Sequence, residues 1–180
     1  SIIDDWIINQ KGTIAHVNDV KKDFYGTLRY YIEFSNGNKS DPMPCFVDCE
    51  YHLWTIQDAK DGDILLSPST SKGDKECPFI FKDIDENGVV RFHAALLQSK
   101  TFKIADGITN VMGYANAGYH IPATQEQRDL LFTKMKEAGY EWDEENKELK
   151  KIEQKSKEKT KFYNSMDDLI ADALIEEIEN

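Results

Sequence analysis

Short runs of β-forming residues, separated by glycine-containing turns, fill most of the first 120 residues of this sequence. The turns fall at residues 9–12, 35–38, 60–63 and 85–88, and each contains a glycine. Asn-Gly and similar pairs reverse the chain tightly, and a chain that reverses this often builds antiparallel strands in preference to long helices. We therefore expect an α+β fold that is mainly β.

Residues 1–53 are predicted to form a small SH3-like β module. Aromatic and β-branched residues mark strands at 5–8, 13–17 and 28–34, and a further extended stretch leads to 45–47. Four or five short strands in a segment of this length favour a small barrel or a strongly bent sheet.

Residues 54–152 are predicted to form a second compact β module. Thr55 and Asp58 are spaced to cap a single helical turn at its start. Strands are expected at 64–66, 78–82, 89–97 and 101–105, whereas residues 108–120 favour no regular element. Side chains alternate along a strand, so Val90, Phe92, Ala94 and Leu96 are expected to share one face.

A helix at 124–138 is the clearest element of the sequence. Thr124 is a typical N-cap residue, Gln127 completes a capping box, and Gly139 follows the last turn. The apolar residues between these two ends recur at helical spacing. A hairpin at 140–152 is predicted to follow the helix and to close the edge of the preceding sheet.

A charged linker at 153–163 leads to an acidic amphipathic helix predicted at 164–180. An apolar stripe of this kind packs on its own chain, on a second copy to make a homo-oligomer, or in a partner's groove. The candidate partner-binding residues are those of the stripe and the carboxylates beside it: Met166, Leu169, Ile170, Ala173, Leu174, Ile178, Asp168, Asp172 and Glu176.

The charge of the chain selects among classes of partner. Its net charge of −11 opposes generic binding of nucleic acids, which relies on Lys and Arg at phosphates. It favours a basic protein partner instead. No apolar run approaches the roughly 20 residues of a membrane span, and the first ten residues do not resemble a signal peptide. We therefore expect a cytoplasmic protein, without membrane contact, whose three cysteines are reduced.

One basic patch supports an alternative, a barrel that binds single-stranded nucleic acid. Basic groups interleaved with aromatic rings can track phosphates while the rings stack on bases. The residues of this patch are Lys21, Lys22, Arg29, Tyr30 and Tyr31, and the aspartates at 4, 5, 19 and 23 dilute its charge.

A second alternative is a thiol- or zinc-dependent protein that uses Cys45, Cys49 and His52. Zinc takes four Cys or His ligands, and Cys77 or His93 would complete the set. On an extended strand, however, Cys45 and Cys49 lie roughly 13 Å apart, too far for one metal ion. A Cys–His nucleophile pair would need an oxyanion turn that neither thiol has nearby. We therefore expect no metal, no cofactor and no enzymatic activity.

The three tryptophans, Trp6, Trp54 and Trp142, each begin or end a predicted element. Core anchoring is the ordinary role of a tryptophan at such a position. One that is exposed would instead indicate a partner site.

Three segments resemble a recurrent family of proteins from gut bacteria of the Bacteroides type and from their phages and mobile elements. These are residues 54–63 (WTIQDAKDGD), 78–82 (PFIFK) and 123–151, which begin with ATQEQRDLLFTKMKEAGYEWD. Residues 5–7 and 12–14 are similar to the start of small SH3-like barrels. The resemblance covers about residues 1–155, and it implies a mobile-element context without implying a mechanism.

The leading hypothesis from the sequence is a non-enzymatic protein-interaction module of a phage or mobile element. In one version it is an acidic inhibitor of a host defence or nuclease system, whose carboxylates cover a surface that otherwise binds nucleic acid.

Overall fold

The computed structural model describes residues 4–43, 50–68, 76–107 and 110–153. Residues 1–150 form one compact unit and residues 151–180 a second, of which only the first three residues are described. The predicted tail helix, with every residue of its stripe, lies outside the described residues. In the described part of the chain, no helix combines the length and the apolar character that a membrane span requires.

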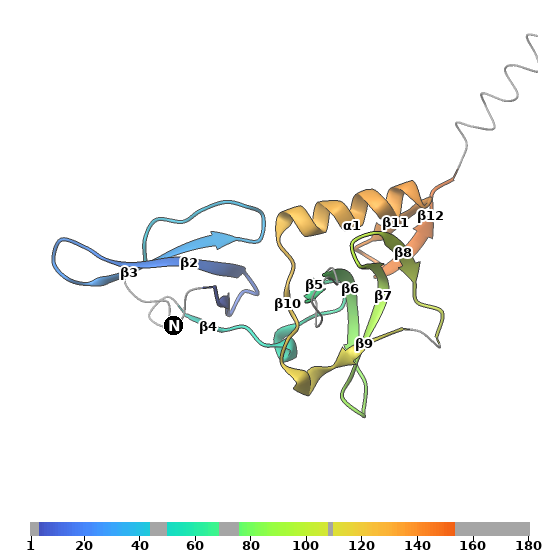
Figure 1. Cartoon of the computed structure of the whole chain (residues 1–180), viewed down its shortest axis with the longest axis horizontal. Helices are drawn as coiled ribbons and strands as arrows, with labels where there is room; N and C mark the ends of the chain where they lie inside the picture. The colour runs from blue at the N-terminus through green and yellow to red at the C-terminus, as the bar shows by residue number, and fades with distance from the viewer. Residues whose placement is uncertain (1–3, 44–49, 69–75, 108–109, 154–180) are drawn as a thin grey trace, which may run out of the picture. The chain divides into compact units, whose positions relative to one another are not determined.

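Four antiparallel strands form the first sheet, in the order β3-β2-β1-β4. Figure 1 shows β2 and β3 side by side as a long hairpin. They are β1 (Trp6–Asn9), β2 (Ile14–Lys22), β3 (Leu28–Phe34) and β4 (Tyr51–Leu53). Two isolated bridges, from Tyr30 to Met43 and from Glu33 to Lys39, bring the chain back along the outer edge of β3. The fold is mainly β, as the turn pattern predicts.

The second sheet has the order β10-β5-β6-β7-β8, with β9 paired to β7 as well. Its strands are β5 (Ile64–Ser67), β6 (Cys77–Ile84), β7 (Val89–Leu97), β8 (Thr101–Ile104), β9 (Val111–Tyr114) and β10 (Ile121–Pro122). Two 3₁₀ turns, η1 (Ile56–Asp58) and η2 (Ala115–Ala117), precede β5 and β10 respectively. Strand β9 and turn η2 therefore occupy much of the segment for which the sequence favours no element.

The predicted helix cap and the hairpin after the helix are confirmed, but the hairpin forms a two-stranded sheet of its own and does not extend the edge of the second sheet. Helix α1 (Gln125–Glu137) begins after Thr124, whose hydroxyl accepts a 3.3 Å hydrogen bond from the Gln127 amide. The Gln127 side chain in turn accepts from the Thr124 amide at 2.9 Å. Gly139 adopts a φ of 87° just after the helix, and β11 (Tyr140–Asp143) then pairs with β12 (Glu148–Lys151).

The second sheet is buried on both faces. One face packs with Trp54 and with Ile8 of β1, and the other packs beneath Leu131 and Met135 of α1. Because Ile8 belongs to the first sheet, the two predicted modules share a core within residues 1–150.

One prediction for β7 is wrong. Val90 and Phe92 pack in the core that contains Trp54, whereas Ala94 and Leu96 pack on the α1 side. The pairing with β6 passes from Phe92 directly to Ala94, so His93 is the extra residue of a bulge. A single extra residue moves every later side chain of a strand to the opposite face.

Candidate functional site

The outer half of the β2–β3 hairpin is the candidate site. Residues 4–8 bond to the backbone of β2 only as far as Val17, so beyond that point the described pairing of β2 is with β3 alone. Lys21 faces Arg29 and Lys22 faces Leu28 at the end of this two-stranded segment. The hairpin is anchored at its base by Val17 and Ile32, which are buried in the core of the first sheet.

Asp23 fixes the turn that joins the two strands. Its Oδ1 accepts hydrogen bonds from the backbone amides of Tyr25 and Thr27, both at 2.9 Å. Its Oδ2 accepts from Arg29 Nε at 2.8 Å, and its own amide donates to the Thr27 carbonyl. Gly26 has a φ of +81°, a conformation that side chains with a Cβ rarely adopt. The turn therefore has a single well-bonded shape.

The ionisation of Asp23 follows from these bonds. Partial burial raises the pKa of its carboxyl, but the hydrogen bonds from Thr27, Arg29 and Tyr25 outweigh that effect. The net result is a pKa below the ordinary value for aspartate. The carboxylate that organises the turn is therefore charged throughout the physiological pH range.

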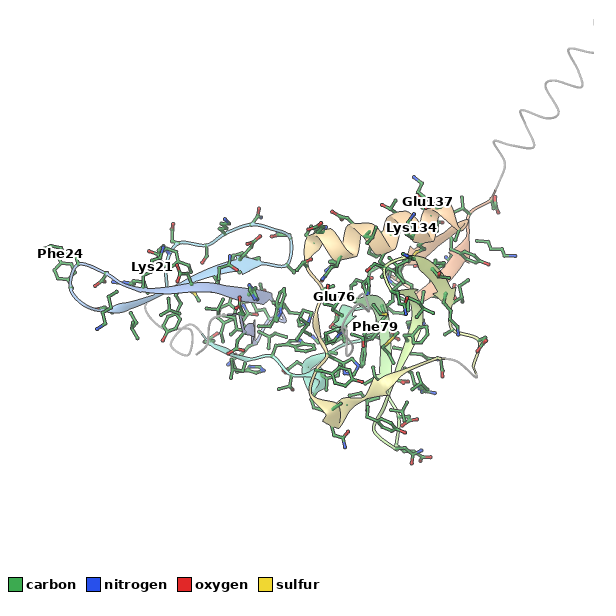
Figure 2. All side chains as sticks on the ribbon, in the orientation of Figure 1. Lys21, Phe24, Glu76, Phe79, Lys134 and Glu137 are labelled. Atoms are coloured by element: carbon green, nitrogen blue, oxygen red, sulfur yellow. The ribbon has the colours of Figure 1, made fainter. Side chains whose placement is uncertain are left out.

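Two aromatic rings project from this fixed turn into solvent. Phe24 is 96% exposed and Tyr25 is 87% exposed, and their rings meet edge to face with centroids 5.5 Å apart. Figure 2 shows Phe24 at the outer end of the hairpin, pointing away from the strands. Leu28 and Tyr31 on β3 are also partly exposed, on opposite faces of that strand. We call Phe24, Tyr25, Leu28 and Tyr31 the hairpin tip.

The basic patch predicted from the sequence lies on the same hairpin, but two of its three positive charges, those of Lys21 and Arg29, are paired with aspartates. Lys21 forms an ion pair with Asp19 at 3.1 Å, and Arg29 is held by Asp23. Lys21 also lies over the Tyr31 ring, 5.3 Å from its centroid. Tyr30, by contrast, packs toward the core of the first sheet, because adjacent residues of a strand face opposite ways. The structure therefore groups part of the patch while reducing its positive charge.

The residues of the thiol or zinc alternative are described only in part. Cys45 and Cys49 lie outside the described residues. His52 Nε2 lies 3.0 Å from Asp58 Oδ1, and the Cys77 sulfur accepts a hydrogen bond from the Gln98 amide at 3.2 Å. Within the described ranges, no three His, Cys, Asp or Glu side chains are grouped closely enough to hold a metal ion.

Phe24, Tyr25 and Leu28 are the tip residues that lie outside the patch predicted from the sequence. Their signal was present, because residues 23–26 place two adjacent aromatic residues between an aspartate and a glycine in a tight turn. Residues in such a turn point into solvent, so aromatic side chains there gain nothing from a core. That pattern indicates a contact surface for another molecule.

No protein-family model, curated protein sequence or solved structure matches this chain. The functional assignment therefore depends on the geometry and charge of its own residues.

Proposed function

We propose that this chain is a non-enzymatic protein-interaction module whose hairpin tip enters an apolar pocket of a partner protein. The observation that carries the proposal is the nearly full exposure of Phe24 and Tyr25 on a turn fixed by the Asp23 carboxylate. Monomeric proteins bury most large aromatic side chains, and an exposed pair of this kind is typical of an interface.

The energetics of the tip favour binding. An aromatic side chain carries on the order of 150–250 Å² of surface, most of which leaves water in a well-fitted pocket. The turn is already ordered by five hydrogen bonds to Asp23, so little backbone entropy is lost on association. A preorganised aromatic anchor of this type commonly dominates the affinity of an interface.

The charge of the chain supports a basic partner. With a net charge of −11, the chain attracts positively charged surfaces at long range and thereby accelerates encounter. At the tip, the ion pairs of Lys21 and Arg29 keep the surface around the rings close to neutral. Burial of the tip rings then supplies the affinity, and the negative charge of the chain as a whole guides the partner toward it.

Three further points extend this proposal. The acidic helix predicted at 164–180 is proposed as a second contact to the same partner or to another copy of the chain. The mobile-element context favours an inhibitor of a defence or nuclease system. The first sheet, extended along β3 by residues 39–43, is proposed to be the SH3-like barrel. None of these points is needed for the role of the hairpin tip.

A photo-crosslinking experiment tests the proposal. Benzoylphenylalanine replaces Phe24 in one variant and Tyr114, a half-exposed aromatic residue on β9, in a matched control. Irradiation in the source cells is expected to yield a discrete protein adduct from position 24 that is absent from position 114. The adduct is expected to disappear when Tyr25→Ala is added to the position-24 variant.

Two outcomes would overturn the assignment. Equal labelling from both positions would mean that the tip has no preferred protein partner. Adducts with nucleic acid in place of protein, together with a shift of short single strands at low salt, would favour the nucleic-acid alternative, because exposed rings beside Lys21 and Lys22 can also stack on bases.

A further inference from the structure

A pocket of about 550 Å³ lies away from the hairpin tip, among the start of β1, the β4–η1 junction, η2 and β10. Its walls include two of the three tryptophans, Trp6 and Trp54, and two adjacent acids, Asp4 and Asp5. No lysine or arginine lines it in the described part of the chain. The pocket therefore combines aromatic walls with an uncompensated negative charge.

The backbone of Asp4 and Asp5 is fixed against β2. The Asp4 amide donates to the Val17 carbonyl at 2.9 Å, and the Asp5 carbonyl accepts from the Val17 amide at 2.9 Å. The Asp5 carboxylate makes no hydrogen bond or ion pair with the described residues, and the Asp4 carboxylate has only His16 Nε2, 3.8 Å away. Both carboxylates are thus available to a cation.

Two buried ring nitrogens in the pocket walls lack hydrogen-bond partners. Trp54 is 8% exposed and His120 is 4% exposed, yet neither Trp54 Nε1 nor His120 Nδ1 is bonded within the described structure. His120 Nε2 lies 2.6 Å from the Met112 carbonyl and must donate to it, which leaves Nδ1 as an acceptor. Burial lowers the pKa of His120, despite this hydrogen bond, and so favours the neutral ring.

Unsatisfied buried polar groups are uncommon and point to an absent partner. His120 Nδ1 is closed to water in this structure, so a small rotation of its ring is needed to reach a ligand. The Trp54 indole N–H is a donor and does not bond the N–H groups of a cation, so only the face of its ring can serve one. The rim is apolar, because Leu53 and Ile121 line the pocket and remain partly exposed. An alkyl chain would lie against such a rim with its polar end inside.

We propose that this pocket binds an organic cation that carries a guanidinium or ammonium head on an apolar stem, as arginine and lysine side chains do. The Asp4 and Asp5 carboxylates would accept its N–H donors, and the indole rings of Trp6 and Trp54 would face its charge. His120 Nδ1 supplies a further acceptor deeper in the wall. The pocket and the hairpin tip are separate surfaces, so this site stands whether or not the tip binds a protein.

Indole N–H signals of the ¹⁵N-labelled full chain test this site, since each tryptophan gives one signal that a Trp→Phe variant assigns. Titration with N-acetyl-arginine amide is expected to shift the Trp6 and Trp54 signals and to leave Trp142 unchanged. N-acetyl-citrulline amide, a neutral molecule of nearly the same shape, is expected to cause no shift. Free arginine, run beside the capped form, shows whether a small molecule or a peptide side chain is the better ligand.

Charge variants complete the test. Asp4→Asn with Asp5→Asn is expected to weaken binding of N-acetyl-arginine amide by at least about tenfold, from the loss of the carboxylate contacts. Glu86→Gln, in the exposed β6–β7 turn, removes one charge elsewhere and is expected to leave binding unchanged. Absence of Trp6 and Trp54 shifts, equal shifts with citrulline, or equal losses in the Glu86 variant would each overturn the proposal.

Discussion

Two neighbouring leucines on α1 are expected to contribute very differently to the stability of the protein. Leu131 is fully buried against the second sheet, whereas Leu130 is 36% exposed. Leu131→Ala is expected to lower the free energy of unfolding by about 2–5 kcal/mol, because it leaves a cavity in the core. Leu130→Ala, the matched control, is expected to cost less than about 1 kcal/mol. Urea unfolding of both variants checks this, and equal losses would contradict the described packing.

Asp143 gives the residue-scale prediction for pH. The Lys150 ammonium bonds to its carboxylate, and Asn146 adds further hydrogen bonds, so the pKa of Asp143 lies well below its ordinary value. A lowered pKa in the folded state stabilises the protein above the unfolded pKa of about 4, and this contribution is lost as pH falls further. Asp143→Asn is therefore expected to be less stable than the wild type at neutral pH.

In acid, the free energies of unfolding of the wild type and of Asp143→Asn are expected to become equal, because the Asp143 carboxylate of the wild type is then protonated. The loss begins near pH 4 and continues toward the lower pKa of the folded state, so denaturation midpoints measured from neutral pH to well below pH 4 check the trend. A stability difference that stays constant across this range would show that the ion pair is not its source.

At the scale of elements, the capping box of α1 is a local feature with a measurable effect. Thr124→Ala removes the hydroxyl that accepts from the Gln127 amide and is expected to destabilise the protein by about 1 kcal/mol. Thr133→Ala, the same change in the exposed middle of the helix, is expected to be neutral or slightly stabilising. Thermal unfolding of the two variants checks this, and similar melting temperatures would contradict the assigned cap.

Elements of this kind were predictable because their signals are local. The Thr124 box, the Thr55–Asp58 turn and the Asp85–Gly88 hairpin turn each depend on residues within four positions of one another. The faces of β7 were not predictable, because the bulge at His93 is set by pairing with β6. The pocket was not predictable either, because Asp5, Trp54 and His120, which line it, come from segments far apart in the sequence.

The hairpin tip was predictable only in part. Its turn could be found from Asp23 and Gly26, but the exposure of Phe24 depends on how far β2 and β3 extend beyond the first sheet. The alternation of apolar and polar residues through Val17 predicts the buried base of the hairpin. The register shift between Val17 and Asp19 breaks this alternation, so the sequence pattern does not show that β2 continues to Lys22.

At the scale of the whole molecule, long-range charge and the hairpin tip contribute differently to binding. The net charge of −11 acts over several ångströms and is screened by salt, whereas burial of the tip rings is not. The association rate with a basic partner is therefore expected to fall steeply between low and high salt, while the dissociation rate changes little. Surface plasmon resonance at several salt concentrations measures both rates. A salt dependence confined to dissociation would contradict this division.

The most direct test of the central claim is the affinity of a tip variant for the partner captured at position 24. Phe24→Ala with Tyr25→Ala is expected to lower affinity by at least roughly 30-fold, the equivalent of about 2 kcal/mol for an aromatic anchor. Its stability should stay within about 0.5 kcal/mol of the wild type, because both rings are exposed. A control with Val111→Ala and Tyr114→Ala, exposed residues of β9, should bind normally. An affinity for the tip variant within twofold of the wild type would contradict the claim that the hairpin tip is the binding site.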